Sequence, residues 1–297
     1  MTTLYTQAES NIRKTWILIT GFFALIILLG WLFSYFFDNQ LFFIFALIFA
    51  FLQSFLAFWH SDKIILAMTG AKAIEKRDNP ELYRIVENLS ITAGIPAPKI
   101  YVLEELQPNA FATGRNPEHS AIAVTRGLLE KLERTELEGV ISHEISHIKN
   151  RDILLASAIV VLVSLVAILS NWFLRMRRWG PRKREERGNA IFLIFGLLGA
   201  ILAPIVANLI QLAISRKREF LADASGALLT RYPDGLISAL EKISRDQNIL
   251  KRALPSTAHL FIISPFKGRE IENWLVKIFS THPPLEERIK ALKGVTV

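Results

Sequence analysis

Cysteine is absent from the 297 residues of this sequence. A disulfide framework, a thiolate metal site and a cysteine nucleophile are therefore excluded. Charge is also missing from long stretches, although charged residues make up 21% of the chain. With 51% hydrophobic residues and a mean hydropathy of +0.32, this uneven distribution predicts membrane segments joined to a water-facing domain.

Four runs contain no charged residue, namely 16–37, 41–59, 153–174 and 190–214. Each is close to the roughly 20 apolar residues that a helix needs to cross a bilayer. Soluble proteins seldom contain several buried helices of this length, so we expect four transmembrane helices in two hairpins. The net charge of +8 then fits basic residues that flank the spans and face anionic lipid, not a nucleic-acid partner.

Lysine and arginine predict how the chain is oriented in the membrane. Arg13 and Lys14 precede the first run and Lys63 follows the second, whereas the turn between these runs has no basic residue. Because basic residues concentrate on the cytoplasmic side, we expect the N-terminus and the chain from residue 61 onward to face the cytoplasm. The connection 175–188 is rich in arginine, against the same rule, so a full crossing and a re-entrant pair both stay open for the second hairpin.

The remaining parts, 61–152 and 215–297, are long enough for one folded domain. We therefore expect four segments: a membrane hairpin in 1–60, the first part of the domain in 61–152, an inserted hairpin in 153–214 and the second part in 215–297. The helices and short strands together predict an α+β fold, with a helix over 79–94, strands over 99–104, 109–114 and 121–125, and a helix that starts with a capping box of Thr135 and Glu138.

The segment ISHEISHIKN, residues 141–150, carries the most specific motif. His143 and His147 are four residues apart, so both imidazoles lie on one face of a helix and can bind one zinc ion. Glu144, which directly follows His143 on the helix, can reach a metal-bound water without being a ligand and can take its proton. The alternative, two unrelated histidines beside a solvated glutamate, is much less favoured by this spacing within a predicted helix.

A catalytic zinc needs a third protein ligand. One class of such motifs places glycine and a third histidine at the positions that Asn150 and Ile153 occupy here, so that class is excluded. Glu219, on a later predicted helix, is the candidate ligand. Asp223 lies four residues further on the same face and is placed to bond the outer nitrogen of a zinc-bound histidine.

Three segments in order, HEISHIKNRD (143–152), REFLADASGA (218–227) and THPPLEERI (281–289), with an apolar hairpin after the first, resemble the HtpX heat-shock protease family. This resemblance covers nearly the whole chain. It implies a gluzincin-type zinc metallopeptidase domain, related to the CAAX prenyl endopeptidase, with its active site at the cytoplasmic membrane surface. It puts one zinc ion on His143, His147 and Glu219, with Glu144 as the catalytic base.

The resemblance implies roles for further residues. Asp223 matches an aspartate behind the metal ligands, and Arg288 matches a family arginine. His282 would help to hold the oxyanion or order the site. The stretch PNAFATG (108–114) matches an edge strand that pairs with substrate, and its best candidate contacts are Asn109, Ala110 and Phe111.

The resulting hypothesis is an endopeptidase of a bacterial-type plasma (inner) membrane, with its peptidase domain facing the cytoplasm. Its substrates would be membrane proteins, misfolded or damaged, or unfolded polypeptides. A catalytically silent zinc-binding scaffold is the alternative, but it would not need Glu144. A metal carrier should have ionisable residues inside its spans, and an intramembrane protease should have its ligands there, whereas these ligands lie just outside the apolar runs.

Overall fold

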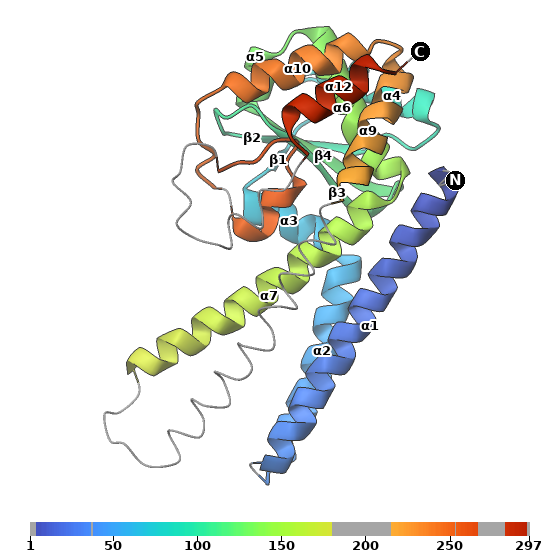
Figure 1. The fold of residues 1–297 in the computed structure, drawn as a ribbon. Helices are drawn as coiled ribbons and strands as arrows, with labels where there is room; N and C mark the ends of the chain where they lie inside the picture. Colours follow the sequence, from blue (N-terminus) through green and yellow to red (C-terminus); the bar gives the residue numbers. More distant parts are fainter. Residues whose placement is uncertain (1–3, 37, 180–214, 253, 267–282, 296–297) are drawn as a thin grey trace.

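A computed structural model of the chain describes residues 4–36, 38–179, 215–252, 254–266 and 283–295. Long helices project from one side of an α+β domain (Figure 1). The elements are α1 (Leu4–Phe36), α2 (Leu41–Trp59), α3 (Ser61–Thr69), β1 (Lys72–Ala73), α4 (Pro80–Ala93), β2 (Lys99–Leu103), β3 (Ala110–Asn116), β4 (His119–Thr125), α5 (Arg126–Lys131), α6 (Arg134–Lys149), α7 (Asp152–Trp179), α9 (Arg216–Thr230), α10 (Pro233–Arg245), η1 (Pro255–Leu260) and α12 (Leu285–Lys293).

The sheet has the strand order β1-β2-β4-β3. The β2–β4 pair is parallel and the other two pairs are antiparallel. Successive side chains of β4 alternate between two cores: Ile122 and Val124 pack with α4 and α6, whereas Ala121 and Ala123 pack with α3 and α7. Burial on both faces explains why this strand reads as a continuous apolar run. The predicted α+β class and all three predicted strands are confirmed.

Local sequence signals account for the ends of two helices. Asn79 caps α4 by accepting a hydrogen bond from the Leu82 amide at 3.0 Å, and Gly94 ends it in the left-handed conformation. The predicted capping box of α6 was placed two residues too late. The box consists of Glu133 and Glu136, because the helix begins at Arg134.

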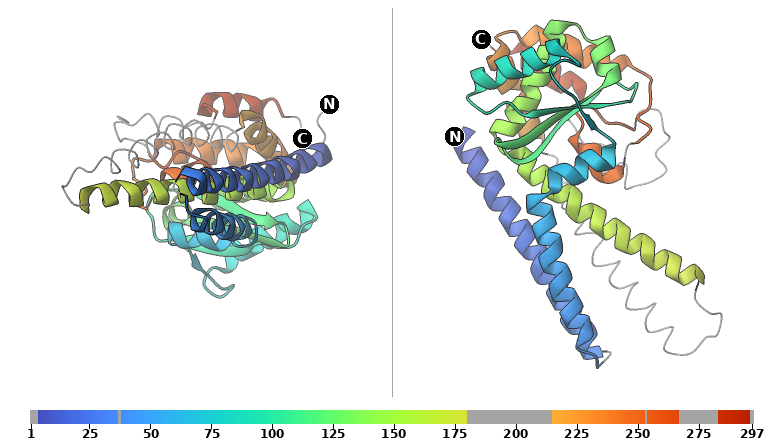
Figure 2. Two further views of the ribbon diagram at one scale, coloured as in Figure 1. Left: turned by 90° about the horizontal axis from the view of Figure 1, so that it is seen from below. Right: turned by 180° about the vertical axis from the view of Figure 1, so that it is seen from behind.

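The helices α1 and α2 form an antiparallel hairpin that extends away from the domain, and α7 diverges from it on the same side (Figures 1 and 2). The helices α1 and α2 are each long and apolar enough to cross a membrane, and most of their side chains are not buried. Phe45 and Phe51, for example, are 67% and 68% exposed. An apolar surface this extended is typical of contact with lipid.

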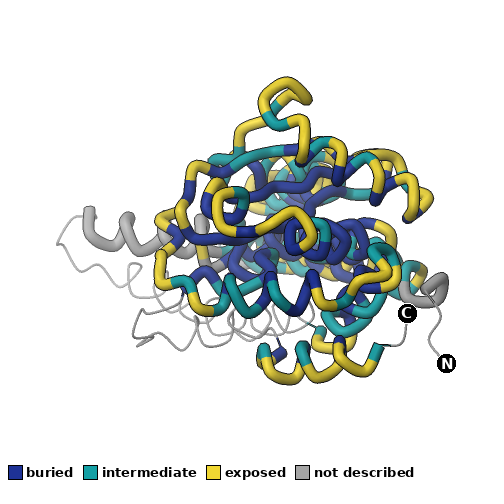
Figure 3. Tube along the Cα trace, turned by 90° about the horizontal axis from the view of Figure 1, so that it is seen from above, coloured by how far each residue is buried: buried dark blue, intermediate teal, exposed yellow. Residues whose placement is uncertain are grey.

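Among the described residues, two of the four predicted spans, α1 and α2, thus have the length and apolar composition that a crossing requires. The described side chains of the third run, in Asp152–Val166, form an apolar helix shorter than a full span. The fourth run, 190–214, lies outside the described residues. The buried parts of the chain concentrate in the sheet and the helices packed on it (Figure 3).

Candidate active site and metal centre

Three candidate metal ligands meet where α6 and α9 lie side by side (Figure 1). The Nε2 atoms of His143 and His147 are 3.1 Å apart. The carboxylate oxygens of Glu219 lie 3.8 Å from Nε2 of His143 and 3.6 Å from Nε2 of His147. Ligand atoms bound tetrahedrally to one ion at about 2.0 Å would be about 3.3 Å apart. The three side chains therefore fit one small metal ion.

A glycine allows the two ligand-bearing helices to come this close. Gly226, two helical turns after Glu219, faces Ser142 and His143. A Cβ atom at Gly226 would lie 2.9 Å from the Ser142 hydroxyl and 3.0 Å from the His143 amide nitrogen. These distances are too short for a real Cβ, so the absence of a side chain sets the spacing that brings Glu219 to the histidines.

A carboxylate lies behind each histidine. Nδ1 of His143 is 2.9 Å from Oδ1 of Asp223, and Nδ1 of His147 is 2.9 Å from Oδ2 of Asp152. An ionised carboxylate only accepts hydrogen bonds, so each Nδ1 carries the hydrogen. With a metal ion bound, each Nε2 lone pair would be directed at the shared metal position.

Arg288, on α12, holds Asp223 in place. Its Nε and Nη2 atoms donate to the two oxygens of Asp223 at 2.8 and 2.6 Å, and both side chains are buried. Burial opposes ionisation, but the charge and hydrogen bonds of Arg288, with a contact from His143, lower the pKa of Asp223 to about 2. Burial likewise opposes the guanidinium charge, but Asp223 raises the pKa of Arg288. Both groups are therefore charged at neutral pH, and Asp223 is a fixed acceptor for His143.

Glu144 is buried beside the candidate ligands. Burial raises the pKa of Glu144 to about 7; the charge of His147 opposes this rise and that of Glu219 adds to it. Such a pKa suits a group that takes up and returns a proton near neutral pH. Burial disfavours a charge on His147, yet Asp152, Glu219 and Glu144 together raise the pKa of His147 to about 9. The site therefore stabilises positive charge, as a cation-binding site must.

A cavity of about 40 Å³ adjoins these groups. This volume holds about three water molecules. Residues from β3, α6, α7, α9 and the η1 region line it, namely Ala112, Glu144, His147, Asp152, Ile153, Ala156, Arg218, Glu219, His259 and Leu260. The cavity therefore has room for a water molecule beside Glu144.

The predicted substrate strand, β3, is at the edge of the sheet within the described part of the chain. The Asn109 carbonyl accepts a hydrogen bond from the Thr125 amide at 2.9 Å, so the backbone groups of Ala110 and Ala112 face away from β4. The carbonyl of Ala110 already accepts a bond from the Ile262 amide at 3.0 Å. As expected, β3 is an edge strand, but an outward-facing carbonyl of its free edge already bonds a residue of the same chain.

The predicted contacts at this strand are buried. The side-chain Nδ2 of Asn109 donates to the Ile263 carbonyl at 2.9 Å, and its side-chain Oδ1 accepts from the backbone amide of Ala110 at 3.1 Å. The ring of Phe111 packs on Phe261, on the face of the sheet opposite α6. In this structure the Phe111 ring is therefore not available to a substrate, and the backbone edge of β3 is free only if residues 262–263 leave it. His282 lies outside the described residues.

No role in the site was predicted for Asp152 from the sequence. Arg151 has a positive φ of 59°, which ends α6 and lets α7 start in a new direction. This turn brings the Asp152 carboxylate back to His147. An acidic residue five positions after the second histidine is the signal that could have indicated it.

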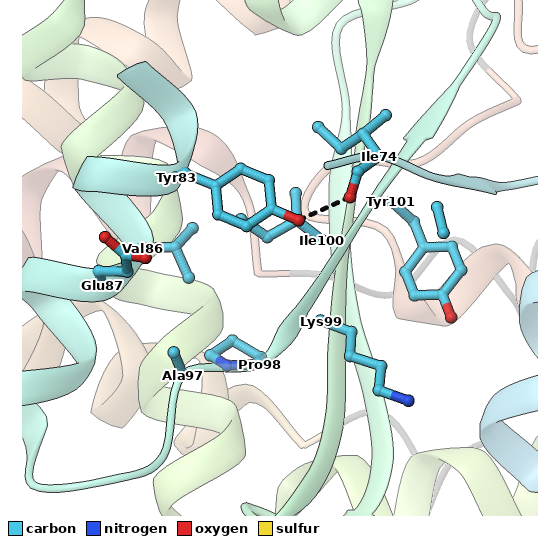
Figure 4. A pocket seen from close by; sticks show the side chains of 10 residues that line it. Ile74, Tyr83, Val86, Glu87, Ala97, Pro98, Lys99, Ile100 and Tyr101 are labelled. Carbon is cyan, nitrogen blue, oxygen red and sulfur yellow. Dashed lines mark hydrogen bonds between the residues drawn. The ribbon is translucent and has the colours of Figure 1, made fainter. Parts of the chain in front are cut away.

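A second hollow lies elsewhere, between α4 and the strands β1 and β2 (Figure 4). It has a volume of about 310 Å³, and the Tyr83 hydroxyl at its wall donates to the Ile74 carbonyl at 2.6 Å. None of the predicted site residues lines it. The metal-ligand geometry therefore distinguishes the small cavity as the candidate active site.

The sequence comparisons agree with this geometry. The family model for peptidase family M48 matches residues 76–296, which include the three candidate ligands and Glu144. The chain belongs to peptidase family M48. The resemblance inferred from the three motifs is thereby confirmed, and this M48 peptidase is a metallopeptidase with membrane-capable helices.

Relatives named "Protease HtpX homolog" match this M48 peptidase over most of its length. One from Thermoanaerobacter pseudethanolicus is 45% identical over 301 residues, which cover 99% of each chain. One from Pyrococcus furiosus is 48% identical over 258 residues, which cover 86% of each chain. The crystal structure of S. mikatae Ste24p, 21% identical, compares at a TM-score of 0.49 over 97% of this chain and 66% of that one.

Proposed function

We propose that this M48 peptidase is a zinc-dependent endopeptidase of the membrane that cleaves misfolded or damaged membrane proteins. The proposal rests above all on the convergence of His143, His147 and Glu219 on one point, with Glu144 beside them. Two imidazoles and one carboxylate form a donor set that suits catalytic zinc and leaves a fourth position for water or substrate.

The residues of the site would divide the reaction among them. A zinc ion held by the three ligands would polarise the peptide carbonyl and make a water acidic. Glu144 would take the proton of the attacking water and pass it to the leaving amine. Asp223 and Asp152 would keep the two imidazoles oriented, and the backbone of β3 would align an extended peptide.

The position of the site supports a membrane substrate. The motif helix α6 is followed directly by the apolar helix α7, whose residues Ile153 and Ala156 line the catalytic cavity. A polypeptide that leaves the bilayer would therefore reach this site before it reaches the rest of the domain. The basic residues Arg13, Lys14 and Lys63 support a cytoplasmic location of the domain at the plasma (inner) membrane.

The test compares the wild type with Glu144→Gln, both purified in detergent without zinc. Zinc is then added, and cleavage of an unfolded protein such as casein and of a destabilised membrane protein is followed. We expect the wild type to cleave and a chelator to stop it. Glu144→Gln should bind zinc equally well but lose about 10²–10⁴-fold in rate, the usual contribution of a general base.

Two results would contradict the proposal. Equal cleavage by both proteins would show that Glu144 is not the base. Tight zinc binding with no cleavage of either substrate by the wild type would favour the silent scaffold.

A further inference from the structure

A buried amide on the N-terminal helix α1 reaches the carboxylate behind His147. Nδ2 of Asn11 donates to Oδ1 of Asp152 at 2.6 Å and to the Asn150 carbonyl at 3.0 Å. Both partners can only accept, so the amide nitrogen faces them. Asn11 has no exposed surface.

The two oxygens of Asp152 have separate partners. Oδ2 faces Nδ1 of His147 at 2.9 Å, whereas Oδ1 faces Asn11 at 2.6 Å and Nε of Arg218 at 3.6 Å. A carboxylate held on one oxygen presents the other in a fixed direction. Partners of this kind set the tautomer and ring orientation of a metal-binding histidine.

Burying an amide is unfavourable unless it is hydrogen-bonded, so an apolar side chain would pack α1 at lower cost. We propose that Asn11 is a positioning residue of the metal site. It orients Asp152, which orients His147, and it thereby couples the first membrane helix to metal affinity. This inference rests on the proposed metal site.

The experiment measures the zinc dissociation constant of the full-length protein in detergent by competition with a chromophoric chelator. The variants are Asn11→Ala, Asn11→Asp and the control Thr15→Val. Thr15 is equally buried one turn along α1, and its hydroxyl bonds back to the Asn11 carbonyl at 2.8 Å. It therefore reports the effect of altered packing of α1 alone.

We expect Asn11→Ala to raise the dissociation constant about tenfold, the lower end for loss of a partner behind a metal ligand. Asn11→Asp should raise it further, because a second carboxylate then faces Asp152. Thr15→Val should leave it unchanged. In an Asp152→Asn background, Asn11→Ala should add nothing, because the two residues act through one contact.

Cobalt(II) gives a second reading, because its visible spectrum reports ligand geometry and should change in Asn11→Ala but not in Thr15→Val. Unchanged zinc affinity in both Asn11 variants, or an equal loss in Thr15→Val, would overturn the inference. A wild type that binds no zinc would overturn the proposed function instead, so the two failures are distinct.

A different observation concerns the end of η1 and the chain that follows it, residues 259–263. These residues pair with the edge that a substrate would use: the Ile262 amide bonds the Ala110 carbonyl at 3.0 Å, and the Asn109 side chain bonds the Ile263 backbone. The Ile262 carbonyl accepts from Nη1 of Arg288 at 3.1 Å. His259 and Leu260 line the catalytic cavity from the same side.

The other outward-facing amides of β3 are engaged as well. Ala112 donates to the Glu144 carboxylate, and Gly114 faces the Ser157 hydroxyl at 3.4 Å. We propose that residues 259–263 form an autoinhibitory contact in the place of the substrate backbone, which must leave β3 before cleavage. This inference also rests on the proposed function.

The absence of native cysteine makes a direct test possible. Ala110 and Ile262 contribute to the same core, so a disulfide in Ala110→Cys/Ile262→Cys should lock the contact. Oxidised with diamide, this variant should lose cleavage but keep its zinc affinity, and a thiol reductant should restore cleavage. The wild type under the same conditions controls for the oxidant.

A second variant tests release of the segment. Phe261→Ala removes the ring packed on Phe111 and should raise kcat/KM. Full cleavage by the completely cross-linked variant, or a lower kcat/KM in Phe261→Ala at unchanged zinc affinity, would overturn the autoinhibitory contact. Neither result would contradict the peptidase activity itself, which the wild type reports.

Discussion

At the scale of single residues, Arg288 and Asp223 form a buried ion pair beside the candidate site. They form a two-pronged pair with 2% and 1% exposed side chains. A second bidentate pair, Arg126 with Glu104, has similar distances but is 53% exposed on both sides. Burial makes the difference, because a buried charge that loses its partner has no water to replace it.

Arg288→Gln is therefore expected to lower the free energy of unfolding by about 3–5 kcal/mol, the usual cost of breaking a buried pair. Arg126→Gln should change it by less than about 1 kcal/mol, as exposed pairs do. Urea unfolding of both variants in detergent, followed by tryptophan fluorescence, measures the difference. Equal effects would show that the Arg288 pair is not buried in solution.

Between elements, the position of α6 depends on close contacts on two sides. Gly226 lets α9 approach from one side. On the other side Glu136 accepts hydrogen bonds from Ser238 and Lys242 of α10, at 2.5 and 2.9 Å, and from the Glu133 amide. The motif helix is thus held by a steric contact and a polar one.

Gly226→Ala should destabilise the protein by about 1–3 kcal/mol, because a methyl group is forced into a closely packed contact. It should also weaken zinc binding, because α9 moves and carries Glu219 away. Gly21→Ala, the same change in α1 with no atom of the described residues within 4 Å, should be neutral or stabilising, since alanine favours helix. Thermal unfolding and chelator competition give both quantities, and a stabilised Gly226→Ala would contradict the close approach.

The Glu136 contacts predict a pH dependence. Burial opposes its ionisation, but bonds from Lys242, Ser238 and Glu133 lower the pKa of Glu136 below its ordinary 4.5. A lowered folded-state pKa means that the stabilisation is complete above pH 4.5 and is lost as pH falls through the folded value. Glu136→Gln should therefore cost about 2 kcal/mol at pH 7 and progressively less below pH 4.5.

Unfolding curves at several pH values measure this trend. Glu138→Gln, which removes the partly exposed partner of Arg134 on the same helix, should have only a small effect at pH 7. A Glu136→Gln effect that stayed constant down to pH 3 would contradict the assigned contacts.

At the scale of the whole molecule, the candidate metal ligands join two parts of the domain that residues 153–214 separate in sequence. His143 and His147 come before residues 153–214 and Glu219 after them. A bound ion would therefore hold the two halves together as well as serve the reaction. Its binding adds to stability because the unfolded chain has no such site.

Removal of metal should accordingly lower the unfolding temperature. Zinc at a thousandfold excess over its dissociation constant contributes about 4 kcal/mol. Thermal unfolding with and without a chelator tests this, with Glu219→Gln as the matched variant that should not respond. A wild type indifferent to the chelator would show that the halves are held by packing alone.

The sequence by itself determined what depends on neighbours along the chain. Spacing placed His143 and His147 on one helical face, Asn79 and Gly94 at the ends of α4, and alternating strands in the sheet. Hydropathy located the two helices whose membrane-crossing length the structure confirms. Each of these inferences involves residues a few positions apart, whose relative placement follows from helix or strand geometry alone.

Only the tertiary structure decided which distant groups meet at the site. Asn11 reaches Asp152 from another helix, and Ile262 covers Ala110. No local periodicity relates such residues. Their distances result from the packing of several elements together, and the same packing sets how closely α9 approaches α6 at Gly226.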